Sequence, residues 1–153
     1  MNSLYTSTDF KDIQQRIDIL TSAAQPLWGK MTVNEMVCHL SDPFRDFLKI
    51  RNTKPVVPFF LRPLMKMMLL NEKPFSKNAP TVKPYLQSPK GKGTKKTNFE
   101  TDKAELKNLL NKFVSVTHNS DLGTHAALGQ LNKEEAGLFM WKHLDHHLRQ
   151  FGC

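Results

Sequence analysis

Cysteine is scarce in this chain, and a long apolar run is missing. Only Cys38 and Cys153 are present among 153 residues, which argues against a disulfide framework and favours a reducing cytoplasmic compartment. No apolar run approaches the roughly 20 residues of a membrane span, because the best candidate, FFLRPLMKMMLL at 59–70, is broken by a proline and two basic residues. The first residues are polar and lack the apolar core of a signal peptide. We therefore expect a cytoplasmic protein without a membrane partner.

Motifs of several large enzyme classes are also missing. The sequence shows no Gly-rich phosphate loop, no Ser-His-Asp arrangement and no dinucleotide fingerprint, and GKGTKK at 91–96 is too short for a P-loop. Neither cysteine is a convincing nucleophile. Cys38 points about 100° away from His39 on a helical wheel, and Cys153 is the last residue.

Acidic residues are missing from one long stretch. Residues 73–98 hold seven lysines and no acid, whereas the rest of the chain has 15 basic and 14 acidic residues, so the formal charge of +8 comes almost entirely from this segment. Such a segment is usually a solvated loop. Nucleic-acid binding would need lysines on one face with aromatics free for stacking, and Phe75, Tyr85 and Phe99 are too scattered for that. We expect 73–98 to be a surface loop that carries little packing and is not the functional centre. Nucleic-acid binding is the less favoured alternative.

Four segments carry the apolar spacing of amphipathic helices. They cover about 8–22, 32–51, 102–117 and 132–152. The second begins with a capping box of Thr32 and Glu35, and the fourth begins at Asn132 with Glu135 three residues on. Pro43 predicts a kink or break inside the second helix.

A long connection separates the second and third helices. It begins with a short helix at 58–71, whose Met65, Met67 and Met68 we interpret as core filling or a lid, and continues as the lysine- and proline-rich loop. The chain is long enough for one domain with a proper core and shows no internal repeat. We predict a single all-α domain over residues 1–153, a four-helix bundle with one long crossover.

Three histidines fall within five positions of the last helix, in WKHLDHHLRQFG. Residues four apart on a helix differ in direction by about 40°, so His143 and His147 share the inward face, while His146 lies at its edge. His39 lies beside the apolar side of the second helix. Two histidines at i, i+4 and a third on a facing helix can hold a metal and leave one coordination position open. Such pairs arise in many helices without metal, and a lone His39 is more often an ordinary, hydrogen-bonded core histidine.

The same residues resemble a known family. WKHLDHHLRQ is similar to the H-x-x-H-H-x-x-Q ending of the DinB-like superfamily, also called YfiT-like, and MTVNEMVCHL resembles its second helix, which carries the first ligand. The segment 125–152 looks most like a functionally unassigned branch. The resemblance implies a four-helix bundle with a divalent metal on His39, His143 and His147, and His146 corresponds to an adjacent histidine that does not usually ligate. Imidazole donors suit both zinc and nickel.

Two features depart from the branch. Gly137 stands where an aromatic is expected, and it weakens the first turns of the helix by roughly 1 kcal/mol relative to alanine. The turn HAALG at 125–129 lacks the expected proline and aromatic. Both differences concern the substrate pocket more than the ligands.

The resemblance implies an enzyme that activates a small thiol on the metal for S-transfer to an electrophile. A metal-dependent hydrolase using a bound water is the alternative, and binding of a metal or nucleic acid without catalysis is a third. Whether the protein is an enzyme is left open, and so is a homodimer; the expected partner is a small-molecule substrate.

A general base is hard to find in the sequence. Asp42 lies one turn beyond His39 and either accepts the second N–H of that ring or is a solvated acid. Gln150 either orients a bound group or hydrogen-bonds within the bundle. Glu35 and Asp46 are the carboxylates on this helix that share the inward arc with the ligands. The shortage of an obvious base favours thiol transfer over hydrolysis. His118 and His125, in the connection before the last helix, are expected to be solvated.

Overall fold

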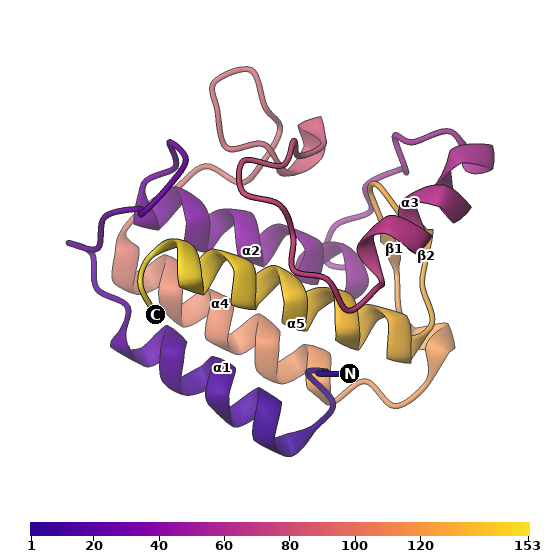
Figure 1. The fold of residues 1–153 in the computed structure, drawn as a ribbon, viewed down its shortest axis with the longest axis horizontal. Coiled ribbons are helices and arrows are strands. Elements are labelled where there is room, and N and C mark those ends of the chain that lie inside the picture. Colours follow the sequence, from indigo (N-terminus) through magenta and orange to yellow (C-terminus); the bar gives the residue numbers. More distant parts are fainter.

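The computed structural model describes residues 1–153, and its architecture is mostly helical (Figure 1). The α-helices are α1 (Ser7–Ile19), α2 (Val33–Phe47), α3 (Arg62–Leu69), α4 (Phe99–Val114) and α5 (Lys133–Gln150), and short 3-10 turns are η1 (Phe59–Leu61), η2 (Lys83–Tyr85) and η3 (Asn119–Asp121). A small antiparallel sheet pairs β1 (Thr124–His125) with β2 (Gly129–Gln130). The helical class predicted from the sequence is confirmed, whereas the two-stranded sheet was not predicted.

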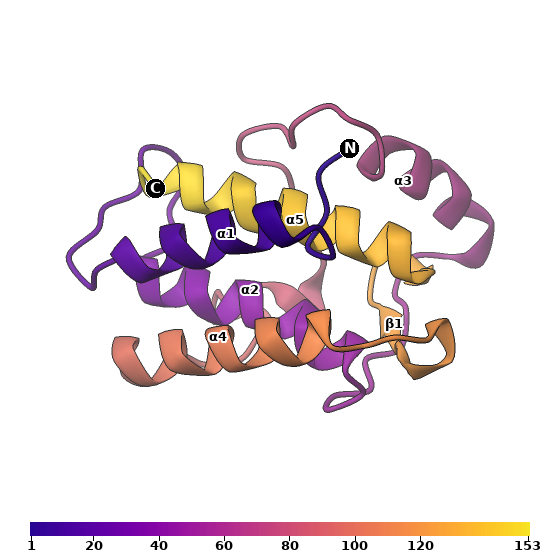
Figure 2. The ribbon, with the colours of Figure 1, turned by 90° about the horizontal axis from the view of Figure 1, so that it is seen from below.

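The four longer helices pack along one another around a common core. α2 lies against α4 and α5, and α1 lies against α5 and α4 (Figures 1 and 2). In the core, the rings of Phe44 and Phe47 on α2 contact Phe113 on α4, with centroids 5.2 and 5.7 Å apart. These are the apolar faces that the helical spacing predicts.

Helix ends follow their capping residues. Thr32 and Asn132 both form the capping boxes expected from the sequence. α4 begins at Phe99, before the expected 102, because the side chain of Asn98 accepts the first free backbone N–H groups. α1 ends at Ile19 rather than near 22, since Leu20 is already extended.

α2 is shorter than expected, and Pro43 does not break it. Pro43 lies inside a helix that is continuous from Val33 to Phe47. The end comes from a left-handed residue, Lys49, with φ 57°. The N–H of Lys49 bonds to the carbonyl of Asp46 and that of Ile50 to the carbonyl of Arg45, which is the Schellman pattern of a helix C-terminus.

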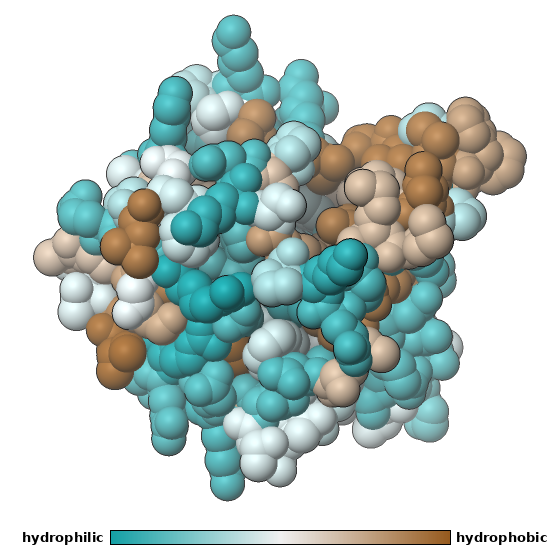
Figure 3. Space-filling model, viewed as in Figure 1, coloured by the Kyte–Doolittle hydropathy of each residue, from teal (hydrophilic) through white to brown (hydrophobic).

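The short helix in the connection is present, but most of its apolar side chains are exposed. Its methionines were interpreted as core filling or a lid, yet Met67 and Met68 are exposed together with Phe59 and Phe60. α3 projects from the packed helices (Figure 1) and forms a brown apolar lobe on the surface (Figure 3). Of the three methionines, only Met65 is partly buried against the core, next to Leu69 at the end of the helix.

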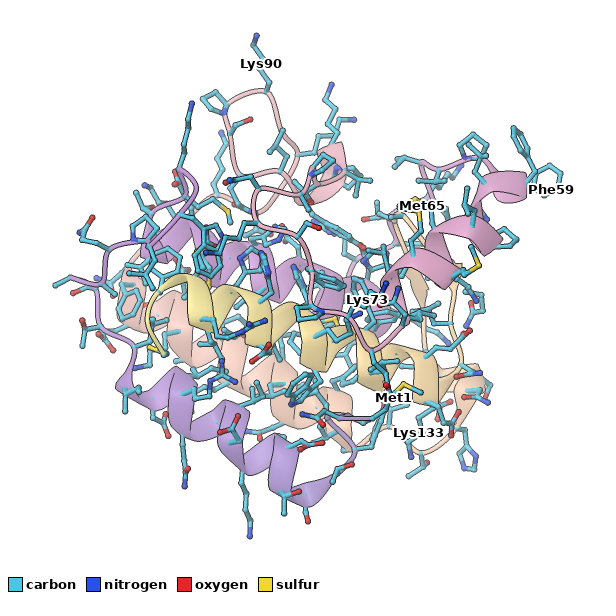
Figure 4. All side chains as sticks on the ribbon, in the orientation of Figure 1. Met1, Phe59, Met65, Lys73, Lys90 and Lys133 are labelled. Carbon is cyan, nitrogen blue, oxygen red and sulfur yellow. The ribbon has the colours of Figure 1, made fainter.

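The lysine-rich segment 73–98 packs more than predicted. Its seven lysines are exposed, as expected, and Lys90 points away from the molecule (Figure 4). Pro84 and Tyr85, however, are buried. The expectation of a loop with little packing is therefore wrong for η2. Burying the apolar surface of the Tyr85 ring stabilises the packed segment relative to one that leaves this ring in water.

Gly137 is explained by the N-terminal segment that crosses α5. The N–H of Leu4 donates to the carbonyl of Gly137 at 3.3 Å. A Cβ on Gly137 would lie 2.6 Å from both Ser3 Oγ and Tyr5 Cδ2, so the glycine permits this close crossing.

None of the five helices combines the length and the apolar character that a membrane-spanning helix needs.

Candidate metal site

Three buried histidines from two helices converge on one point. One ring nitrogen from each of His39, His143 and His147 lies within 4.8 Å of the others, and the three side chains are 4, 7 and 8% exposed. His39 comes from α2, and the other two come from consecutive turns of α5, which packs against α2 (Figure 1). The spacing of four along α5 therefore places two rings on the face that meets His39.

Hydrogen bonding fixes the orientation of the His39 ring. Its Nδ1 lies 2.8 Å from the backbone carbonyl of Tyr85. A carbonyl only accepts, so Nδ1 carries the proton and Nε2 carries the lone pair. Nε2 is the nitrogen that faces His143, at 2.9 Å from its Nε2.

Gln150 fixes the ring of His147 in the same way. The amide Nε2 of Gln150 donates to the carbonyl of Trp28 at 2.7 Å, which leaves its Oε1 to accept from His147 Nδ1 at 2.8 Å. The lone pair of His147 is thereby placed on Nε2. Of the two roles considered for Gln150, the structure shows the hydrogen bond within the helical core, and that bond holds a candidate ligand.

His143 is held by its neighbour rather than by an oxygen. Its Nε2 lies 2.9 Å from Nε2 of His39. Because His39 Nε2 offers a lone pair, His143 Nε2 must donate, and the unprotonated Nδ1 of His143 is buried without a partner. For His143 Nε2 to bind a cation, its proton must move to Nδ1 or leave.

Burial keeps all three imidazoles neutral. Loss of solvation lowers the pKa of His39, and it lowers the pKa of His143 and His147 well below the usual value, with repulsion from neighbouring rings adding to the effect. Neutral imidazole is the form that binds metals. Metal–nitrogen bonds of about 2.1 Å at tetrahedral angles would place the nitrogens about 3.4 Å apart, within the range from 2.9 to 4.8 Å seen here. The donor set therefore fits a divalent ion.

His146 lies beside this cluster and under a cover of aromatic rings. Its ring centroid is 4.9 Å from that of His147, 5.7 Å from Trp28 and 6.0 Å from Phe75. The ammonium group of Lys77 lies 4.6 Å from the centre of the Trp28 ring. The segments carrying Trp28 and Phe75 therefore cover this side of the site.

Asp42 does not hold His39, and it is not solvated either. Its carboxylate is fully buried. It accepts hydrogen bonds from Gln87 Nε2 and the backbone N–H of Thr94, both at 3.0 Å, and pairs with Arg51 at 3.2 Å. Both alternatives considered for Asp42 are wrong, because the folded lysine-rich segment supplies donors that the helical wheel cannot show.

The other candidate bases are also engaged elsewhere. Asp46 pairs with Arg51 at 3.1 Å and accepts from the hydroxyl of Tyr85 at 2.8 Å. Glu35 closes the capping box of α2 and pairs with Lys96. The carboxylates near His39 in the sequence are thus committed to structure.

Tyr85 is the site residue that sequence reasoning missed. Its carbonyl holds His39, while its hydroxyl donates to Asp46 and accepts the backbone N–H of Ala126 at 2.9 Å. The available signal was a Pro-Tyr pair inside an otherwise lysine-rich stretch. The segment 73–98 was expected to lie apart from the functional centre, and this contact corrects that expectation.

His125 was expected to be solvated, but it is buried. Its Nδ1 accepts the backbone N–H groups of Ala127 and Leu128, both at 3.2 Å. Burial lowers its pKa to about 3. The turn between β1 and β2 folds this ring onto Phe47, whereas His118 is exposed, as predicted.

Fold and site together define a mostly helical protein with a buried cluster of three histidines between two of its helices. Residues 50–152 match a family model described as protein of unknown function (DUF1569). The chain belongs to this family, which is part of the DinB/YfiT-like superfamily. The match includes His143 and His147 and begins after His39. Comparisons with curated proteins and with solved structures gave no match.

Proposed function

We propose that the protein is a metal-dependent enzyme in which His39, His143 and His147 hold zinc or nickel. In this proposal α1, α2, α4 and α5 form the four-helix bundle of the DinB-like superfamily, and the segment between α2 and α4 is its long crossover. The observation that carries the proposal is the set of three buried, neutral imidazoles with facing nitrogens. In His39 and His147 the second ring nitrogen is bonded to a protein oxygen. Proteins commonly orient histidine ligands of metals in this way.

The proposed reaction is the transfer of a small thiol to an electrophile. A divalent ion bound at this site would favour the thiolate form of that thiol. The chain itself would contribute neutral donors, rigid ring orientation and the exclusion of water by Trp28 and Phe75. Lys77 adds one cationic group beside the covering segment, which suits a thiol carrying polar or anionic substituents.

Hydrolysis needs a base near a metal-bound water, and the structure supplies no support for one. Asp42 and Asp46 are both paired with Arg51, and Glu35 is held by the helix cap. Thiol transfer depends less on such a base, because a free thiol has a pKa of about 8.5 against about 15.7 for water, so a bound cation would ionise the thiol more completely at neutral pH.

The test is turnover by untagged protein loaded with zinc or nickel. A panel of small thiols is offered together with a chromogenic electrophile. We expect thiol-dependent product formation that is lost in His147→Ala and kept in His118→Ala, which changes an exposed histidine away from the cluster.

Two other outcomes would contradict the proposed reaction. Thiol-independent cleavage of an ester or amide, lost in His147→Ala, would identify a hydrolase. Full metal occupancy without any turnover would identify a metal-binding protein that is not an enzyme for these substrates.

A further inference from the structure

The segment formed by η1 and α3 exposes its apolar side chains. Phe59 is 77% exposed and Met67 is 68% exposed. Residues 59–68, which we name the apolar arm, also expose Phe60, Leu61, Leu64 and Met68. The arm forms a convex lobe that projects beyond the packed helices (Figure 3), and Phe59 points away from the molecule at its tip (Figure 4). Contiguous apolar surface of this kind marks an interaction site.

Polar contacts on its inner side hold the arm in this orientation. Arg62 donates to the carbonyl of Val57 at 2.9 Å, and Lys66 pairs with Glu135 of α5 at 3.2 Å. At the other end of α3, Lys142 of α5 donates to the carbonyl of Leu69 at 2.8 Å. The cations of α3 thus face the protein, while Leu64, Met67 and Met68 face outward and only Met65 and Leu69 pack against the core, which is nearly the reverse of an ordinary surface helix.

The part of the sequence that contains the arm is strongly basic. Residues 47–99 contain 12 basic residues and one acidic residue, Glu72; the rest of the chain therefore has 10 basic (22 − 12) and 13 acidic (14 − 1) residues. All seven lysines of 73–98 are exposed. This segment and α3 lie on the upper side of the molecule in Figure 1, opposite α1. Apolar and cationic surfaces therefore occur together on this side.

We propose that the apolar arm docks on an anionic phospholipid surface. Its aromatic and aliphatic side chains would enter the interfacial region, and the lysines of 73–98 would lie against the acidic head groups. A second copy of the chain is a poor occupant, because it carries the same positive charge at the same place. A helix-binding groove on a partner protein would recognise one face of a helix, whereas here the whole tip is apolar.

The proposal is independent of the metal site. It also differs from the sequence-based expectation of no membrane partner, which rested on the absence of a spanning run. α3 has eight residues and is far too short to span a bilayer. The proposed contact of the apolar arm is therefore with the surface of the bilayer only.

The experiment is co-sedimentation of the full chain with vesicles. Vesicles of neutral phosphatidylcholine are compared with vesicles containing about 30% phosphatidylserine, at about 100 mM salt. We expect binding to the anionic vesicles only, weakened by added salt. The double variant Phe59→Ser/Phe60→Ser should reduce the affinity by about tenfold or more. Ile19→Ser, which changes an equally exposed residue on α1, should leave it unchanged.

A second pair of variants tests the charge. Changing Lys90, Lys92 and Lys95 together to glutamine should weaken vesicle binding. The matched change of Lys11, Lys30 and Lys112, which are also exposed but lie outside the basic region, should have little effect.

Several results would overturn the proposal. No binding to anionic vesicles, or equal binding to neutral ones, would remove it. A dimer in analytical ultracentrifugation that is lost in Phe59→Ser/Phe60→Ser would assign the arm to a second copy. Binding to vesicles and to duplex DNA that is the same in wild type and in the phenylalanine variant would show charge attraction alone.

Discussion

Gln150 is the residue on which the orientation of His147 depends. It joins the C-terminal end of α5 to the segment that carries Trp28, because its amide bonds both His147 and the Trp28 carbonyl. We expect Gln150→Ala to weaken zinc or nickel binding by about 10- to 100-fold, since a ligand ring without its second hydrogen bond is free to rotate. Competition with a chromophoric chelator measures the affinity.

Two further variants sharpen this prediction. Gln150→Glu keeps an oxygen that accepts from His147, so it should retain more affinity than Gln150→Ala. Gln130→Ala changes an exposed glutamine on β2 and should have no effect. Wild-type affinity in Gln150→Ala would contradict the role assigned to this side chain.

Individual side-chain partners were the least predictable part of the site. A helical wheel places His39, His143 and His147 on inward faces, because the helical period determines direction. It cannot show that Tyr85, 46 positions away, supplies the carbonyl that His39 uses. The same limit explains why Asp42 was misassigned, since its donors Gln87 and Thr94 come from an irregular segment without periodicity.

At the scale of elements, η2 connects the lysine-rich segment to α2. Tyr85→Phe would remove a hydroxyl that serves two buried partners, Asp46 and the N–H of Ala126. We expect the free energy of unfolding to fall by about 1–3 kcal/mol, because both groups would stay buried with fewer hydrogen bonds. Urea denaturation monitored by circular dichroism measures the change.

The matched control for this variant is Tyr5→Phe. Its hydroxyl makes a single, longer bond of 3.3 Å to the carbonyl of Phe113, so the loss of stability should be smaller. An equal loss in both variants, or none in Tyr85→Phe, would show that η2 is not anchored through this hydroxyl.

Elements were more predictable from sequence than contacts between segments were. Both capping boxes and the four long amphipathic segments follow from local chemistry. The small sheet was missed because each of its strands has only two residues, too few for a period-2 pattern. The outward apolar face of α3 was missed because apolar spacing predicts only that a helix face packs against another apolar surface. It does not say whether that surface belongs to the same chain.

For the whole molecule, the buried histidines predict how stability depends on pH. Burial lowers the pKa of His39, His125, His143 and His147 below the ordinary value of 6.5. Below pH 6.5 the unfolded chain therefore binds protons that the folded chain does not, so unfolding becomes more favourable as the pH falls. The stabilisation is fully present above pH 6.5 and is lost toward lower pH.

This prediction is measured on metal-free protein by urea denaturation between about pH 7.5 and about pH 5.5. Each histidine contributes up to about 1.4 kcal/mol per pH unit. His118→Asn, at an exposed position, should leave the slope unchanged. A free energy of unfolding that stays constant or rises as the pH falls through this range would contradict the neutral, buried state of the four rings.

The most direct test of the central claim is the metal content and affinity of untagged protein, wild type against His39→Ala. His39 lies on a different helix from the other two ligands and outside the region matched by the family model. Its place in the metal site therefore rests only on the packing of α2 against α5. We predict one zinc or nickel ion bound per wild-type chain, with binding lost or weakened at least about 100-fold in His39→Ala and unchanged in His118→Ala. One ion bound equally well without His39, or none bound by the wild type at neutral pH, would contradict a three-histidine metal site.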